Sequence, residues 1–158
     1  RAGRAAVRPH EVAERAAALA AGHDLVLVEG AGGLLVRFDA AGGTLADTAA
    51  LLSAPVLVVA SAGLGTLNAT ELTARELDRR GLEAAGVVIG SWPGAPGLAE
   101  RCNLADLPDV SGLALLGAVP EGAAARPPDA FRTAAPGWLA PRLHGTWDAE
   151  AFRAREAP

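Results

Sequence analysis

The chain has 158 residues with a formal net charge of −4, and 51% of its residues are apolar while only 4% are aromatic. Charges of neither sign run in blocks, which excludes the basic stripe that a nucleic-acid partner requires. The single cysteine, Cys102, excludes an internal disulfide, and we interpret it as a packed thiol in a reducing, cytoplasmic setting. No apolar run approaches the roughly 20 residues that span a bilayer, so we expect a soluble protein with no membrane partner.

Helix-like and strand-like patterns alternate along the first part of the chain. Residues 9–21 place Val12, Ala16 and Leu19 on one face, which predicts a helix. Continuous apolar runs without alternation then occupy residues 24–28, 55–61, 84–90 and 113–120. Such runs are typical of strands that are buried on both faces in a parallel sheet.

Three helices are predicted between these runs, and one more in the tail. Thr44 is the predicted N-cap of a helix that reaches residue 54. Residues 66–80 carry Leu67, Leu72 and Leu77 between charges, which predicts an amphipathic helix. Residues 96–112 predict one helix, or two short ones with Pro108 as a breaker. The tail from residue 136 has weak periodicity, which favours a docked helix followed by a frayed end.

This alternation predicts an open, mainly parallel α/β sheet with helices on both faces. We expect residues 1–142 to form a single, incomplete α/β domain and residues 143–158 to form a C-terminal tail. Ligands of such sheets bind beyond the carboxyl ends of the strands. Four turns rich in glycine or proline lie there, with the sequences EGAGG, SAGLGTLN, GSWPGAPG and PEGAAARPP.

The first of these turns joins a carboxylate to three glycines. Glu29 supplies the kind of oxygen ligand that suits a hard cation such as Mg²⁺. Gly30, Gly32 and Gly33 allow a substrate or phosphate to approach the backbone N–H groups, and they tolerate positive φ. An ordinary turn with a solvated glutamate fits this stretch equally well.

The other three turns each allow a functional and a structural interpretation. Free N–H groups at the helix start around Thr66 and Asn68 would attract a carboxylate or phosphate, or these residues are simple helix caps. Trp92 forms the wall of a base site or packs in the core. Glu121 follows the last strand in what is, alone, a turn. Asp47 is expected to face solvent or a helix neighbour rather than a ligand.

Taken in order, the motifs VEGAGGLLV, TLADTAALL, VLVVASAGLGTLNAT, GVVIGSWP and GAVPEGAA resemble dethiobiotin synthetase over about residues 10–135. The resemblance implies a P-loop NTPase fold and a homodimer. It also implies conversion of 7,8-diaminononanoate and CO₂ into dethiobiotin, in biotin biosynthesis, with ATP as co-substrate and Mg²⁺. In the family scheme a carbamate forms on one amine, ATP phosphorylates it, and the second amine closes the cyclic urea.

The same resemblance assigns roles to individual residues. Glu29 is implied as the magnesium ligand and as part of the nucleotide site. The implied substrate-binding residues are Gly30, Ala31, Gly32, Gly33, Gly65, Thr66, Leu67 and Asn68, the last four receiving the substrate carboxylate across the dimer interface. The implied nucleotide-binding residues are Gly90, Ser91, Trp92, Pro93, Pro120, Glu121 and Gly122.

One departure from the family pattern concerns lysine. All fourteen basic residues are arginines, whereas the family carries a G-x-x-x-x-G-K-[ST] phosphate loop and a second catalytic lysine. We therefore assign no catalytic residue within the chain and expect it to be inactive alone. The absence of methionine indicates a chain that was processed or lacks its beginning, and we favour an N-terminally truncated synthetase. The alternatives are a non-catalytic binding or dimerisation module completed by another chain, and another P-loop superfamily member.

Overall fold

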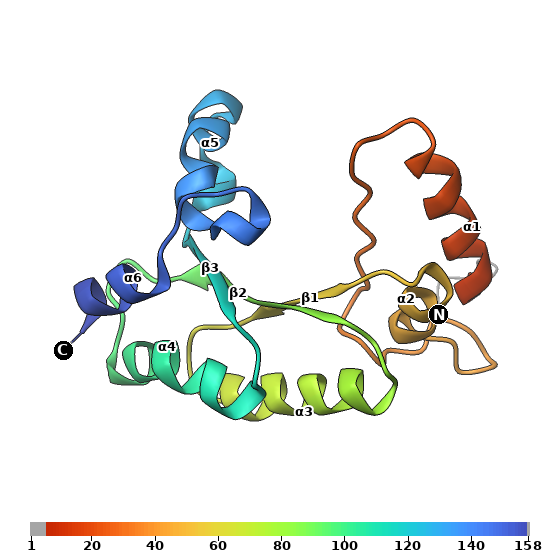
Figure 1. Ribbon diagram of the computed structural model, residues 1–158, viewed down its shortest axis with the longest axis horizontal. Coiled ribbons are helices and arrows are strands. Elements are labelled where there is room, and N and C mark those ends of the chain that lie inside the picture. The colour runs from red at the N-terminus through yellow and green to blue at the C-terminus, as the bar shows by residue number, and fades with distance from the viewer. Residues whose placement is uncertain (1–5, 158) are drawn as a thin grey trace. The chain divides into compact units, whose positions relative to one another are not determined.

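The computed structural model describes residues 6–157, which divide into two compact units (Figure 1). Unit 1 comprises residues up to 56 together with 79–83, and unit 2 comprises residues 57–78 together with those from 84 onward. The elements in chain order are α1 (Pro9–Ala20), α2 (Leu45–Leu52), β1 (Val56–Ala60), α3 (Thr66–Arg79), β2 (Ala84–Trp92), α4 (Leu98–Ser111), β3 (Leu115–Pro120), η1 (Ala123–Ala125), α5 (Pro128–Ala134), η2 (Ala135–Trp138), η3 (Pro141–Leu143) and α6 (Ala149–Glu156).

Both helices of unit 1 begin at well-defined caps. The backbone N–H of Arg8 donates to the carboxylate of Glu11 at 2.7 Å, and Pro9 occupies the first turn of α1, where it costs no hydrogen bond. Thr44 caps α2, which confirms the N-cap predicted from the sequence. Its N–H donates to Asp47 Oδ2 at 2.8 Å while the Asp47 N–H donates back to Thr44 Oγ1 at 3.4 Å.

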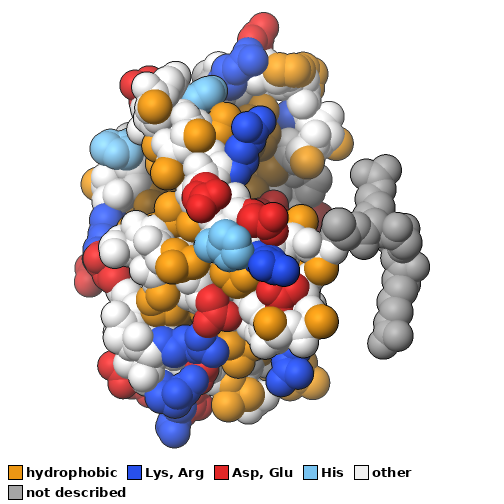
Figure 2. Space-filling view, turned by 90° about the vertical axis from the view of Figure 1, so that its right-hand side faces the viewer, with side chains coloured by type: hydrophobic (Ala, Val, Ile, Leu, Met, Phe, Trp, Pro, Cys, Tyr) orange, Lys and Arg blue, Asp and Glu red, His pale blue; other side chains and the backbone are white. Residues whose placement is uncertain are grey.

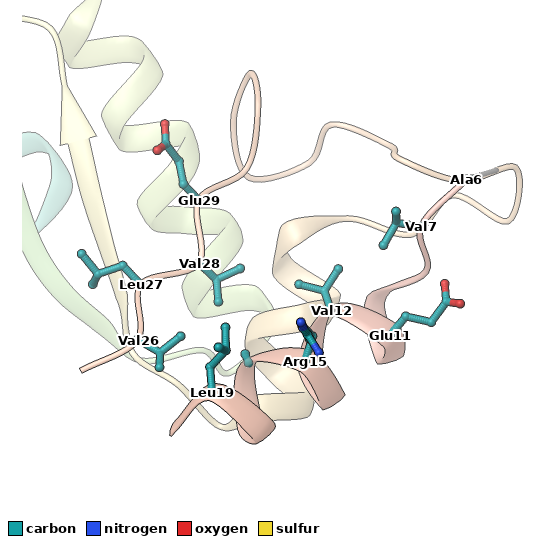
Figure 3. A pocket seen from close by; sticks show the side chains of 11 residues that line it. Ala6, Val7, Glu11, Val12, Arg15, Leu19, Val26, Leu27, Val28 and Glu29 are labelled. Carbon is teal, nitrogen blue, oxygen red and sulfur yellow. The ribbon is translucent and has the colours of Figure 1, made fainter. Parts of the chain in front are cut away.

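The predicted strand over residues 24–28 is wrong. The segment is extended, but no backbone hydrogen bond joins it to any described residue. Val26 and Val28 point toward α1, whereas Leu27 points away from it and is 83% exposed (Figure 3). A strand needs a neighbouring backbone to bond with, and the described residues of unit 1 supply a helix, α1, but no strand for this segment.

Unit 2 contains a three-stranded sheet with the order β1-β2-β3, in which β2 and β3 pair in parallel. Val87 lies opposite Leu115 and Ile89 opposite Ala118, with irregular register between these pairs. Val87, Val88 and Ile89 are all buried, which means that both faces of β2 are covered. The open parallel α/β architecture predicted from the sequence is confirmed.

Gly86 is required for the pairing of β2 with β3. It has a φ of 145°, and a Cβ at this position would lie 2.5 Å from Leu116 Cδ1 and 2.8 Å from the carbonyl oxygen of Ala114. Any larger residue would therefore push the two strands apart and strain the backbone.

The predicted amphipathic helix is confirmed as α3, and its buried face includes two threonines. Thr66, Thr70, Ala74 and Leu77 are buried, while Leu72 is 60% exposed. These four positions recur at the helical period, so they share a face that Leu72 does not join.

Residues 98–111 form one helix, α4, although Pro108 lies inside it. The break that Pro108 suggested is absent, and the helix continues to Ser111, where Gly112 stops it with a φ of 67°. The packed thiol is also wrong, since Cys102 is exposed. The buried face of α4 belongs instead to its neighbours Asn103, Leu104 and Leu107.

The C-terminal segment packs on the sheet of unit 2 through aromatic side chains. Trp147 and Phe152 are buried, and the Phe152 ring meets the Trp92 ring edge-on with 5.4 Å between centroids. Helix α6 contacts both α4 and β3. The end of β2 is thus fixed by residues from the far end of the chain.

Candidate functional site

The predicted site residues fall in both units. Residues 29–33 belong to unit 1, and the remaining candidates belong to unit 2. The geometry of each set is therefore described within its own unit.

The glycine-rich turn of unit 1 rests on the first turn of α2. A Cβ at Gly30 would lie 3.0 Å from Leu45 Cδ2, and the Ala46 N–H donates to the carbonyl oxygen of Leu34 at 3.3 Å. Gly32 and Gly33 have φ values of 95° and 121°, a conformation that glycine tolerates, whereas Gly30 is not among the glycines with positive φ. Substituting either would strain a turn whose two ends are fixed.

Glu29 lies exposed at the end of the extended segment (Figure 3). Its carboxylate makes no hydrogen bond or ion pair with any described residue of unit 1. One free carboxylate fits a Mg²⁺ site, because this ion is usually held by one or two carboxylates together with phosphates and water. Within the described part of the chain, no group of three or more His, Cys, Asp or Glu side chains is placed to hold a metal ion.

A cavity of about 680 Å³ lies between α1 and the extended segment (Figure 3). Apolar side chains line most of it, with Glu11, Arg15 and Glu29 as its charged members. Glu29 is the only predicted site residue among the lining side chains that the structure describes.

Asp47 contacts a helix neighbour, as one of the two expectations for it predicted. Its carboxylate accepts from Thr44 Oγ1 at 2.6 Å and from Arg80 Nη1 at 2.9 Å. The hydrogen bond from the Thr44 hydroxyl, together with Arg80, lowers the pKa of Asp47 against a smaller opposing effect of burial. The carboxylate therefore stays charged well into the acidic range.

In unit 2, the glycine loop (residues 61–65) leads directly into α3. Gly65 has a φ of 91°, and the Thr66 N–H donates to the carbonyl oxygen of Gly63 at 3.3 Å. No backbone acceptor preceding the helix pairs with the N–H groups of Leu67 or Asn68 among the described residues. Asn68 is exposed, so this helix start can receive an anion.

Asn103 supports the glycine loop and was missed by the sequence analysis. Its Nδ2 donates to the carbonyl oxygens of Ala62 at 2.7 Å and Gly63 at 3.3 Å, and the residue is 6% exposed. One signal could have found it: Asn103 shares the helical face of the two buried leucines Leu104 and Leu107, and a polar side chain in such a place needs a partner.

The turns that follow β2 and β3 meet at the edge of the sheet. Trp92 pairs with Pro120 in register, and the Glu121 N–H donates to the carbonyl oxygen of Trp92 at 2.7 Å. Gly122 has a φ of 73° and starts η1. The structure thus brings together two of the predicted nucleotide-binding stretches, residues 90–93 and 120–122.

Individual side chains at this edge differ in exposure. Gly90 and Ser91 are exposed, and Gly90 lies close to Val59 at the end of β1, so that a Cβ at Gly90 would be 2.7 Å from Val59 Cγ1. The Trp92 ring is buried against Phe152, which favours the packing interpretation of its side chain.

On the face shown in Figure 2, neither positive nor negative side chains form a dominant patch. Arginine, acidic and histidine side chains are interspersed there with apolar ones. None of the helices that the structure describes combines the length and the apolar character needed to cross a membrane.

Comparison with known proteins matches residues 2–129 to a family model described as an AAA domain. A protein of Streptomyces coelicolor named "ATP-dependent dethiobiotin synthetase BioD" is 75% identical over the whole chain, which covers 66% of that protein. A protein of the same name from Streptomyces avermitilis is 72% identical over 100% of the chain, which covers 66% of that protein. Another from Saccharopolyspora erythraea is 66% identical over 93% of the chain, and the match covers 65% of that protein.

The chain thus spans about 66% of the length of the relatives that it resembles. Over that span the identity is high and continuous, and the matched residues include every candidate that the sequence analysis singled out. The similarity to dethiobiotin synthetase indicated by the motifs is confirmed, and the chain belongs to the AAA domain family.

Proposed function

We propose that the chain supplies substrate- and nucleotide-binding parts of an ATP-dependent dethiobiotin synthetase, acting on 7,8-diaminononanoate and CO₂ in the cytoplasm. The observation that carries this proposal is the 75% identity over all 158 residues to a protein of that name. Two structural features support it: the meeting of residues 90–93 with 120–122, and the anion-accepting start of α3.

The start of α3 is proposed to receive the substrate carboxylate. Gly65, Thr66, Leu67 and Asn68 lie where N–H groups without helical partners meet the positive end of the helix dipole. Gly30, Ala31, Gly32 and Gly33 are proposed to line the diamine and carbamate region. The two positive φ values in that turn orient its peptide groups in a way that L-residues rarely adopt.

Mg²⁺ is proposed to bind at Glu29, whose carboxylate is unpaired among the residues described. Bound there, the ion would neutralise charge on the transferring phosphoryl group of ATP. The nucleotide base is proposed to lie against Gly90, Ser91, Pro93, Pro120, Glu121 and Gly122, with Trp92 as a buried support.

A homodimer is proposed through the outer face of α3 and the glycine loop. Leu64, in the loop before α3, is 97% exposed, and Leu72 is 60% exposed and lies one helical turn beyond the exposed Asn68. Apolar side chains that are fully exposed beside a binding segment mark an interaction surface. A second copy of the chain would cover them and close the carboxylate site.

The chain alone is proposed to be inactive, because no lysine is present to neutralise the phosphates. The test is a chimera in which the part of the Streptomyces coelicolor relative outside the matched region is joined, in that relative's order, to residues 1–158. Dethiobiotin is then measured from 7,8-diaminononanoate, bicarbonate and MgATP. We expect turnover by the chimera and none by the chain alone.

A folded chimera without turnover, alongside an active intact relative, would overturn the proposed function. Robust turnover by the 158-residue chain alone would instead overturn the requirement for lysine. The thermal melting of each protein, recorded in parallel, separates loss of function from loss of fold.

A further inference from the structure

We propose that Asn103 is the positioning residue of the glycine loop, and that it fixes the start of α3 in its anion-accepting conformation. The inference deepens the proposed function, since the segment that Asn103 positions leads into the residues proposed to bind the substrate carboxylate. Asn103 itself touches neither the substrate nor Mg²⁺ in this scheme.

The hydrogen bonds of Asn103 leave its amide only one orientation. Both partners, Ala62 and Gly63, offer carbonyl oxygens, so only the NH₂ group of the side chain can face them. A buried donor held by two successive carbonyls fixes the direction of two peptide groups at once. Exchanging that donor for an acceptor would place three oxygen atoms in mutual repulsion.

Gly63 links the hydrogen bonds of Asn103 to the start of α3. The carbonyl of Gly63 also accepts the N–H of Thr66, the first residue of α3, at 3.3 Å. Gly65, between them, has no Cβ and therefore lacks the conformational preference of an L-residue, and it adopts a φ of 91°. Without the contact from Asn103, this permissive stretch would sample other conformations and the N–H groups that follow would lose their common direction.

Asn103 is suited to this role by its amide donor. Its Nδ2 bonds to two successive carbonyls of this loop, those of Ala62 and Gly63. Glu100, one turn earlier on α4, also approaches the loop, with Oε1 3.1 Å from the position of a Cβ on Gly63. Because a carboxylate cannot donate to a carbonyl, Glu100 cannot replace Asn103.

The first test uses amide hydrogen exchange of the 158-residue chain by NMR. The variant Asn103→Asp keeps the shape of the side chain but removes the donor, and Cys102→Ser alters the exposed neighbour on the same helix. We expect exchange at the amide of Thr66 to become about tenfold faster in Asn103→Asp, while the amides of β2 and β3 in that variant keep their exchange rates. In Cys102→Ser, we expect the exchange rate at Thr66 to be unchanged.

Arg153→Met serves as a second control, because it weakens α4 at a point away from the loop. If it accelerates exchange at Thr66 as much as Asn103→Asp does, the loop responds to general stability and the inference is wrong. Unchanged exchange at Thr66 in Asn103→Asp would also overturn it. Should Asn103→Asp fail to fold, Asn103→Ser, which lacks the reach to both carbonyls, takes its place with the same expected pattern.

The second test uses the active chimera and separates a positioning role from a structural one. We expect Asn103→Asp to raise the KM for 7,8-diaminononanoate about tenfold and to leave the KM for ATP within about twofold, because only the carboxylate segment moves. Equal changes in both KM values would contradict the inference. If the parent chimera makes no dethiobiotin, the proposed function fails, and hydrogen exchange still decides the role of Asn103.

Discussion

Arg153 Nε donates a 3.0 Å hydrogen bond to the carbonyl oxygen of Leu104, the acceptor four residues before Pro108. Proline has no N–H, so residue 108 cannot bond to this carbonyl as an ordinary helical residue would. Leu104 is buried, and its carbonyl would otherwise lack a donor. A residue of α6 thus replaces the hydrogen bond that α4 lacks.

This replacement predicts a coupling between two distant positions. Arg153→Met should lower the free energy of unfolding by about 1–3 kcal/mol, the cost of leaving a buried carbonyl unpaired. In a Pro108→Ala background the restored N–H should bond to Leu104, so the same substitution should cost clearly less. Urea unfolding of the four chains measures the cycle. Equal costs in both backgrounds would show that Arg153 acts only through its other contacts.

A second prediction concerns the acid sensitivity of the α2 cap. The pKa of Asp47 is lowered in the folded chain, chiefly by the hydrogen bond from the Thr44 hydroxyl. Its contribution to stability is therefore complete above the unfolded pKa of about 3.9 and is lost as the pH falls through the lower, folded pKa.

Asp47→Asn should accordingly lower the free energy of unfolding by about 1 kcal/mol near neutral pH, as expected for a weakened cap, and the difference from the parent chain should shrink below about pH 4. Asp24→Asn, at an exposed position, is the control. The measurement is urea unfolding between pH 3 and 7. A difference that stays constant over this range would contradict the role of the charged carboxylate.

A third prediction follows from the close approach of β2 and β3 at Gly86. Gly86→Ala should destabilise the chain by about 3 kcal/mol, because the methyl group would collide with Leu116 and the φ of 145° would be strained. Gly94→Ala, where a Cβ meets no atom within 4 Å, should change stability little. Thermal melting of both variants decides it, and similar melting temperatures would refute the requirement for glycine.

A fourth prediction tests the proposed metal ligand in the active chimera. Glu29→Gln should reduce turnover at limiting Mg²⁺ by about tenfold or more while leaving the melting temperature nearly unchanged, because the exposed carboxylate makes no contact within unit 1. Glu14→Gln, an exposed site on α1, is the matched control. The Mg²⁺ dependence of dethiobiotin formation is the readout, and an unaltered dependence would remove Glu29 from the site.

A fifth prediction addresses the proposed dimer. Replacing Leu64 and Leu72 by glutamate should shift the chain toward the monomer in analytical ultracentrifugation, since each introduces a charge into the apolar contact. The exposed position Leu98, on a different helix, provides the control. A distribution of species identical to that of the parent would place the interface elsewhere.

The sequence predicted β1, α3, β2, α4 and β3 well, because their apolar runs and glycine stops are local signals, but it did not predict α5. It also predicted the cap at Thr44, which depends on Asp47 three residues away. These features need no knowledge of the tertiary contacts.

The errors share a different cause. The segment over residues 24–28 has the composition of a buried strand, but hydrogen bonding depends on which backbone lies next to it. Likewise, Cys102 and Asn103 are adjacent in sequence, and only the packing of α4 decides that the thiol is exposed and the amide is buried. Pro108 is tolerated because Arg153, 45 positions later, reaches the carbonyl that it leaves unbonded.

The unpaired extended segment gives its flanking charges a role in solubility. Leu25 and Leu27 are exposed on a backbone whose N–H and C=O groups bond to no described backbone group of unit 1, which is the arrangement that seeds cross-β aggregation. Asp24 and Glu29 stand at its two ends, as gatekeeper residues do around aggregation-prone stretches. Neutralising Glu29 should therefore make the chain precipitate at lower concentration, whether or not Mg²⁺ is present.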